Sequence, residues 1–321
     1  MELTAVLITM GVSFLLAVIL GPLFIPLLRR LKFGQHIRED GPQGHQKKKG
    51  TPTMGGTIIL LALSLAFLRF ADDYSLKFYV LMIAVLGFGL VGFLDDYIKI
   101  VFKRNLGLTA RQKLFGQLLV SVIICVLLYQ MGHSTDLPIP GTNVSIPLSW
   151  FYYVLVILMF LATTNAVNIT DGLDGLLAGT SAIAFGAFAV IALVGTEHEA
   201  GFFSAAMIGA VLGFLVFNAH PAKVFMGDTG SLGIGGGLAA VAILTKTEIL
   251  LIVIGGVFVL EMLSVILQVI SFKTRGKRIF KMSPIHHHFE LSGWTEWRVV
   301  LTLWIVGLIF AGLGLFLHEG L

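Results

Sequence analysis

Residues 77–94 read KFYVLMIAVLGFGLVGFL, and Asp95-Asp96-Tyr97-Ile98-Lys99 follow directly. An apolar run of this length approaches the roughly 20 residues that a helix needs to cross a bilayer. The polar pentapeptide therefore lies where such a helix reaches the membrane surface. Apolar runs with acidic residues at one end recur along the chain, and they predict both the fold class and the location of the functional residues.

The rest of the chain has the same character. Of its 321 residues, 56% are hydrophobic and only 12% are charged, and the mean hydropathy is +0.92. Too little polar surface remains to cover an ordinary soluble core, and 25 Phe against 9 Pro exclude a disordered or collagen-like chain. The single cysteine, Cys125, excludes an intramolecular disulfide and a zinc site built from cysteines.

We predict an all-α integral membrane protein with about ten transmembrane helices, forming one polytopic membrane domain over residues 1–321. The predicted spans are approximately 3–28, 54–70, 77–94, 114–132, 150–167, 175–194, 201–217, 230–245, 248–270 and 299–317. The stretch 133–149 between two of them contains three prolines and a glycine, which predicts turns or a short hairpin.

The basic residues predict the orientation of these spans. All Lys and Arg residues except Arg69, Lys77 and Lys246 fall in the loops that follow spans 1, 3, 5, 7 and 9. By the positive-inside rule these loops are cytoplasmic and both chain termini lie outside. The same loops mix acids, amides, glycines and bases, so we expect the active-site loops on the cytoplasmic face.

The first acidic constellation is the pair Asp95 and Asp96, with Lys99 four residues after Asp95 on the same helix face. Adjacent carboxylates repel each other, and desolvation at a membrane edge adds to the cost. A cation should therefore compensate them, either Lys99 or a divalent metal ion. A helix-end charge cluster that marks the interface is the alternative, although the helix dipole favours cations at this end.

Two further constellations lie between later spans. Residues 165–175 contain Asn168, Asp171 and Asp174 at three-residue spacing, with Gly172 and Gly175 beside them. Residues 218–231 contain Asn218, Phe225 and Asp228. The alternatives are a polar turn for the first segment and an N-cap for Asp228 or Thr229 in the second.

Together the three segments predict phosphoryl chemistry that depends on a metal ion. Mg²⁺ takes few carboxylate ligands and leaves positions open for substrate phosphates. Lys48, Lys99, Arg111 and Lys113 lie in neighbouring loops and can bind phosphate oxygens. Lys48 belongs to a lysine run whose alternative role is attraction to anionic lipid.

The segment 284–290 contains His286, His287 and His288, which can bind phosphate or sugar in either protonation state. Three consecutive residues of a regular helix cannot all face one metal ion, which argues against a zinc site. Inside the ninth span, Glu261 and Gln268 share one helix face. Glu261 is either a functional intramembrane acid or a buried hydrogen-bond partner of another helix.

These motifs resemble the polyprenyl-phosphate N-acetylhexosamine-1-phosphate transferases. The resemblance rests on residues 94–99, 165–175, 225–231 and 284–290, and within that superfamily it is to the phospho-N-acetylmuramoyl-pentapeptide transferases. It implies a reaction of peptidoglycan biosynthesis, and hence of cell wall biogenesis, cell shape and cell division. UDP-N-acetylmuramoyl-pentapeptide and undecaprenyl phosphate would give lipid I and UMP, with Mg²⁺ as cofactor.

The resemblance also implies roles for individual residues. Asp95, Asp96 and Asp228 match catalytic acids, and Asp228 is similar to the metal ligand. The residues that resemble binders of the nucleotide sugar are Lys48, Asn168, Asp171, Asp174, Asn218, Phe225, Gln268, His287 and His288. Lys99 joins them as a phosphate-binding candidate. The implied location is the bacterial inner membrane, with no nucleic-acid partner and with a homodimer left open.

Several alternatives stay open at this point. The lipid phosphate either attacks the sugar nucleotide directly, with Asp95 as the favoured base, or an Asp attacks first and forms a phospho-enzyme. A transferase for UDP-N-acetylglucosamine would need the same acidic loops. A secondary transporter or flippase is a different class, and it predicts acids at mid-bilayer rather than at span ends.

Overall fold

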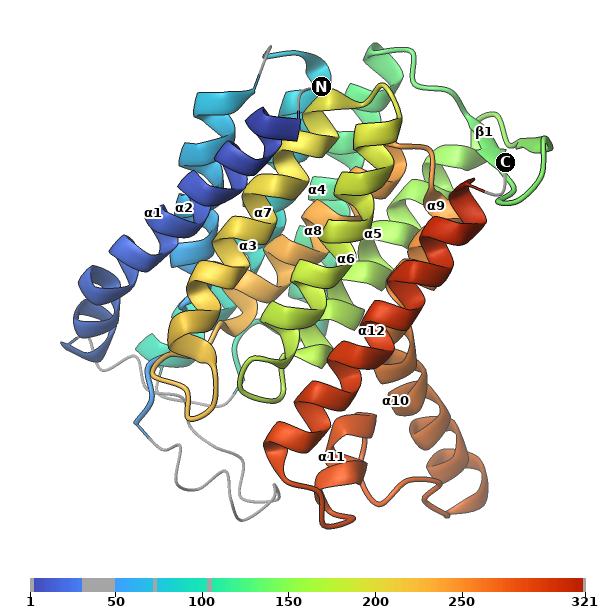
Figure 1. Cartoon of the computed structure of the whole chain (residues 1–321). Helices are drawn as coiled ribbons and strands as arrows, with labels where there is room; N and C mark the ends of the chain where they lie inside the picture. The colour runs from blue at the N-terminus through green and yellow to red at the C-terminus, as the bar shows by residue number, and fades with distance from the viewer. Residues whose placement is uncertain (1–2, 31–49, 72–73, 103–105, 320–321) are drawn as a thin grey trace.

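The structure, a computed structural model, describes residues 3–30, 50–71, 74–102 and 106–319. Its elements in chain order are α1 (Leu3–Arg30), α2 (Gly56–Phe70), α3 (Leu76–Val101), α4 (Ala110–Gln130), β1 (Asp136–Pro138), β2 (Ser145–Pro147), α5 (Phe151–Thr170), α6 (Leu176–Val194), α7 (His198–Asn218), α8 (Gly227–Leu244), α9 (Glu248–Ile254), α10 (Gly256–Arg275), α11 (Ile285–Glu290) and α12 (Glu296–Glu319). The long helices lie side by side and form a bundle (Figure 1).

The bundle has two distinct ends. The start of α1, the strand β1 and the end of α12 lie together at one end, which we call the hairpin end (Figure 1). The short helix α11 lies at the other, which we call the α11 end. The start of α1 and the end of α12 thus lie on the same side of the bundle, and the position of both termini outside the cell stays a prediction.

The prediction of an all-α membrane protein is confirmed. Within the described residues, nine helices are long and apolar enough to cross a membrane, and the shorter apolar helix α2 corresponds to a tenth predicted span. The predicted hairpin is also present, because β1 pairs with β2 in antiparallel register with Leu137 opposite Ile146.

Two spans differ from the prediction. The span expected over 248–270 is not continuous, since α9 ends at Ile254 and α10 begins at Gly256. Gly255 between them has φ −83° and ψ 19°, outside the ordinary helical values. The third span does not end at its carboxylates either: α3 continues to Val101, which places Asp95 and Asp96 inside the helix.

Helix α8 lies at the centre of the bundle. Of its residues, all from Thr229 to Leu244 are buried, so the helix is enclosed on every side. Its contact with α3 depends on Gly92, because a Cβ there would lie 2.0 Å from the main-chain oxygen of Asp228. The glycines of α8 allow close packing: a Cβ on Gly235 would lie 2.6 Å from Cα of Thr164 in α5. Close packing of α3, α5 and α8 brings their polar ends together.

Candidate active site

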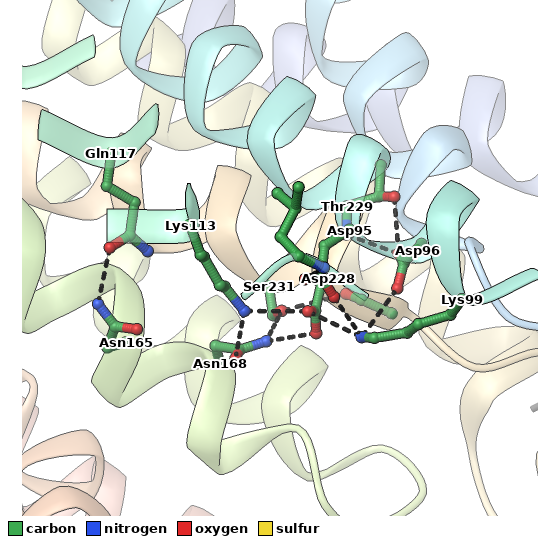
Figure 2. A network of polar contacts seen from close by, with 12 residues as sticks. Asp95, Asp96, Lys99, Lys113, Gln117, Asn165, Asn168, Asp228, Thr229 and Ser231 are labelled. Carbon is green, nitrogen blue, oxygen red and sulfur yellow. Dashed lines mark hydrogen bonds and ion pairs between the residues drawn. The ribbon is translucent and has the colours of Figure 1, made fainter. Parts of the chain in front are cut away.

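Polar side chains from four helices meet in one network (Figure 2). They are Asp95, Asp96 and Lys99 from α3, Lys113 from α4, Asn168 from α5 and Asp228 from α8. We refer to Asp95, Asp96, Asp228, Lys99 and Lys113 as the carboxylate cluster. The structure therefore brings together residues of three predicted segments that lie far apart along the chain.

Asp228 is the centre of this cluster. Its Oδ2 lies 3.0 Å from Nζ of Lys99 and 3.0 Å from Nζ of Lys113. Its Oδ1 accepts a hydrogen bond of 2.8 Å from Nδ2 of Asn168, whose Oδ1 lies 3.3 Å from the Lys113 ammonium. Two cations and an amide therefore hold an ionised carboxylate in one orientation.

The alternative role of Asp228 or Thr229 as an N-cap is wrong. The residue before α8 is Met226, and no side chain caps the helix. Asp228 lies instead in the first turn, where the helix dipole stabilises its negative charge. The hydroxyl of Thr229 donates across to α3, to Oδ2 of Asp96.

The adjacent acids Asp95 and Asp96 have different partners. Asp96 accepts from both the main-chain N–H and the hydroxyl of Thr229, at 2.9 and 2.8 Å. Asp95 accepts from the main-chain N–H of Leu108 at 2.9 Å, and its other oxygen lies 2.5 Å from Nζ of Lys99. Asp96 thus joins α3 to α8, whereas Asp95 is held by a loop amide and by a flexible lysine.

The arrangement suits a cation. Oxygens of Asp95, Asp96 and Asp228 lie within 4.8 Å of one another, and all three carboxylates approach Nζ of Lys99, at 2.5, 3.6 and 3.0 Å. An all-oxygen donor set of this kind fits a hard divalent ion such as Mg²⁺. The ammonium group of Lys99 compensates the three acids, as expected from the spacing.

Asp171 lies just after α5, near the amide of Gly227. Burial, together with the negative charges of Asp228 and Asp96, raises the pKa of its carboxyl to about 8, although the Gly227 N–H acts in the opposite direction. At neutral pH most of this carboxyl is protonated, so it can donate as well as accept a hydrogen bond. Asp171 therefore differs chemically from the ionised Asp228 beside it.

The segment with three consecutive histidines forms α11, and each histidine side chain has a different partner. His286 is buried, and its Nδ1 lies 3.0 Å from Oε2 of Glu261 in α10. His287 pairs with Glu290 at 2.7 Å, and Nδ1 of His288 accepts from the main-chain N–H of Lys281. Glu261 is thus a buried partner of another helix, the second of its two predicted roles.

His286 also lies against the segment 165–175, the second group of polar residues predicted from the sequence. A Cβ on Gly172 would lie 2.2 Å from Nε2 of His286, so only glycine fits between this ring and the segment that carries Asp171. Nε2 of His286 and Oε1 of Glu261 have no hydrogen-bond partner among the described residues. The buried pair of His286 and Glu261 therefore packs against the segment that carries Asp171.

Asn218 and Gln268 were both predicted to bind substrate, and in the structure their side-chain amides form hydrogen bonds with the main chain. Oδ1 of Asn218 accepts from the N–H of Gly175, and its Nδ2 donates to the oxygen of Val224. Gln268 accepts from the N–H groups of Ile279 and Phe280 and donates to the oxygen of Phe280. Both side chains hold loops of the α11 end in place.

The remaining predicted residues are placed as follows. Phe225 is half-buried, and its main chain pairs with Pro52 and Gly55 at the start of α2. Arg111 is exposed on α4. Lys48 lies outside the described residues. Asp174 lies in a separate cluster with His220 and Glu296.

Sequence reasoning did not single out several contacting residues. They are Ser231, which accepts from Asn168 at 2.7 Å, Gln117, which accepts from Asn165 at 3.0 Å, and His220 and Glu296, which contact Asp174. Ser231 shares a segment with Asp228, three residues on, so spacing on a helix could have found it. The others depend on contacts between distant segments.

Comparison with known proteins finds similar proteins that match nearly the whole chain. The model of glycosyl transferase family 4 matches residues 77–246, and the phospho-N-acetylmuramoyl-pentapeptide-transferase signature 1 matches residues 48–60. A phospho-N-acetylmuramoyl-pentapeptide-transferase of Halalkalibacterium halodurans is 63% identical over 97% of both chains. Proteins of the same name from Oceanobacillus iheyensis and Bacillus subtilis are 60% and 58% identical, over 100% and 98% of both chains.

Proposed function

The chain belongs to the phospho-N-acetylmuramoyl-pentapeptide-transferase family, and from this premise we propose how its residues carry out the transfer. It is a transferase of peptidoglycan biosynthesis in the bacterial inner membrane, and it makes lipid I. The donor is UDP-N-acetylmuramoyl-pentapeptide and the acceptor is undecaprenyl phosphate, and UMP leaves.

The convergence of Asp95, Asp96 and Asp228 with Lys99 and Lys113 carries this proposal. The cluster lies near one end of helices long enough to span a membrane. A phosphate on a lipid tail can approach such a place from the bilayer, while a nucleotide approaches from water. The basic residues of the loops at this end support a cytoplasmic active site.

Mg²⁺ is the proposed cofactor, with Asp228 as its main ligand and Asp95 and Asp96 close enough to contribute. When bound, it offsets negative charge on the pyrophosphate of the donor. Lys99 and Lys113 are placed to bind phosphate oxygens, since each ammonium already lies against a carboxylate oxygen that a phosphate oxygen can replace.

The transfer proceeds by direct attack. An oxygen of the lipid phosphate forms a bond to the β-phosphorus, and the bond from that phosphorus to the bridging oxygen breaks, so that UMP leaves with the electron pair. Asp95 accepts any proton on the attacking phosphate or orients it. Asp95 suits this role better than Asp96, because Oδ2 of Asp96 is held by two donors of Thr229, whereas Oδ2 of Asp95 faces the ammonium group of Lys99, which can also bind the attacking phosphate.

The segment from Asn168 to Asp174 binds the sugar nucleotide. Asn168 already contacts Asp228 and Lys113, and Asp171 offers a protonated carboxyl beside them. His287 and His288 lie in α11 at the same end, where they can contact the peptide arm. Lys48 and Phe225 complete the proposed contacts. A homodimer stays a prediction, which light scattering of the purified protein tests.

The test is UMP release by purified protein in detergent with undecaprenyl phosphate. We expect turnover with UDP-N-acetylmuramoyl-pentapeptide and Mg²⁺, almost none with UDP-N-acetylglucosamine, and none after chelation of the metal ion. Without the lipid phosphate, no UMP should appear. A burst of UMP equal to the enzyme concentration would demonstrate a phospho-enzyme and overturn direct attack.

A further inference from the structure

A second cluster of ionisable groups lies outside the carboxylate cluster. Asp174 comes from the segment between α5 and α6, His220 from the loop after α7, and Glu296 from the first turn of α12. Nδ1 of His220 lies 2.9 Å from Oδ2 of Asp174 and 3.2 Å from Oε2 of Glu296. One ring nitrogen therefore serves two carboxylates from two other segments.

The burial of the three side chains is unequal. Asp174 is 2% exposed and Glu296 is 12% exposed, whereas the imidazole of His220 is 35% exposed. Two carboxylates brought this close repel each other unless a donor lies between them. The Nδ1–H of His220 is placed to be that donor, so the ring stabilises the two acids in adjacent positions.

The main chain of the same segment is held as well. The N–H of Asp174 donates to Oε1 of Glu296 at 2.8 Å, and the N–H of Ala222, in the loop of His220, donates to Oδ2 of Asp174 at 3.1 Å. The next N–H, of Gly175, donates to Asn218 at 3.0 Å. The position of this short segment is thus set by α12 and by the α7–α8 loop.

We propose that His220 and Glu296 are positioning residues that hold Asp174, and through it the segment 171–175, in the geometry that binds the sugar nucleotide. The inference rests on the proposed role of Asp171 and Asp174 in binding this substrate. It concerns recognition of the nucleotide sugar and leaves the carboxylate cluster unchanged, because neither His220 nor Glu296 belongs to that cluster.

The experiment measures UMP release while the sugar nucleotide is varied at saturating lipid phosphate and Mg²⁺. His220→Ala should raise the KM for the sugar nucleotide about tenfold, with kcat within about threefold and the KM for the lipid phosphate within about twofold. His220→Asn should restore most of the affinity, since an Asn side chain places an amide N–H near the position of Nδ1. Lys223→Ala is the matched control, because this exposed residue lies in the same loop.

Three results would overturn the inference. In the first, His220→Ala leaves the KM for the sugar nucleotide within twofold of wild type. In the second, His220→Asn is no better than His220→Ala, which would mean that the volume of the ring matters and its N–H does not. In the third, the double variant His220→Ala/Glu296→Ala raises KM by the full product of the two single effects, as independent residues would.

A further variant separates this inference from the proposed function. If Asp174→Asn raises KM and the His220 variants do not, only the positioning role fails. If Asp174→Asn leaves KM unchanged, the assignment of the segment to substrate binding fails and the inference fails with it. Should His220→Ala not fold, His220→Asn and Glu296→Gln, which keep side chains of similar size, decide the question through the same KM.

Discussion

Helices α5 and α8 have a polar cluster at each of their ends. At one end lies the carboxylate cluster, with three acids against two lysines. At the other end lies what we call the tyrosine cluster, formed by His133, Tyr152, Lys246 and Glu248, with one acid against one lysine. The hydroxyl of Tyr152 donates to Oε1 of Glu248, and the Lys246 ammonium lies 3.0 Å from the same oxygen.

The two clusters show how a membrane protein uses buried charge in two ways. In the tyrosine cluster the charges balance, Nζ of Lys246 also lies 4.2 Å from the centre of the Tyr152 ring, and it donates to the oxygen of Ser134 before the hairpin. Such a cluster attaches a loop to the bundle. The carboxylate cluster holds an excess of negative charge, which a bound cation would offset. We infer that charge imbalance distinguishes the catalytic end from the structural end.

The strongest test of this contrast is Asp228→Asn. The substitution keeps the shape of the side chain but removes the charge that faces Lys99 and Lys113, so we expect turnover to fall by about 10²–10³. The thermal midpoint should stay within about 2 °C of wild type, since the charges of Asp95 and Asp96 still balance those of the two lysines. UMP release and a thermal unfolding curve measure the two quantities. A large loss of stability with normal turnover would reverse the roles assigned to the two ends.

Tyr152→Phe tests the tyrosine cluster, where we expect an effect on stability and little effect on catalysis. It removes a buried hydroxyl that donates to Glu248 and lies 3.1 Å from Nε2 of His133. Hydrogen bonds to charged groups contribute roughly 1.5–3 kcal/mol, so we expect stability to fall by about 2 kcal/mol while kcat stays within about twofold. Tyr129→Phe, at a position 73% exposed, is the control and should change neither. A clear loss of kcat in Tyr152→Phe would show that the tyrosine cluster affects catalysis.

The smallest expected effect concerns pH. Burial lowers the pKa of His133 to about 4, and the positive charges of Lys246 and Lys77 act in the same direction. In the unfolded chain histidine takes up a proton below about pH 6.5, whereas folded His133 does not until about pH 4. Stability should therefore fall as the pH drops from 6.5 towards 4, by roughly 1–2 kcal/mol from this group.

His133→Asn should flatten that part of the profile of thermal midpoint against pH. His318→Asn, in the last turn of α12, serves as the control and should keep the slope of the wild type. An unchanged slope in His133→Asn would assign the pH dependence to other groups.

Much of the fold was readable from the sequence because its signals are local. Apolar runs of span length predicted the helices, and the prolines of 133–149 predicted the hairpin. The break at Gly255 was not readable, since Gly255 and Gly256 sit within an apolar run and glycine is frequent in membrane helices. The extension of α3 past Asp95 lies beyond the apolar run that set the predicted span, although the helical spacing of Asp95 and Lys99 indicated it.

The sequence indicated which segments form the site, but not which of their residues contact one another. Neighbours on a helix point about 100° apart, so Asp95 and Asp96 had to differ, but only the position of α8 decides that Asp96 meets Thr229. Similarly, the intramembrane acid Glu261 required a partner, and the fold identifies His286. The family resemblance placed Asn218 among the binders of the nucleotide sugar, whereas in the structure its amide holds the main chain of Gly175.

The enclosure of α8 has a consequence for hydrogen exchange. Amides of a helix buried on all sides exchange only when the whole bundle opens, so those of α8 should be among the slowest in the protein and should report its global free energy of unfolding. Asp228 lies in the first turn of this helix, with its main-chain oxygen against Gly92. The proposed metal-binding carboxylate is therefore attached to the most persistent part of the fold, and a ligand that binds the native protein should raise the protection of α8 by the free energy that it adds to global stability.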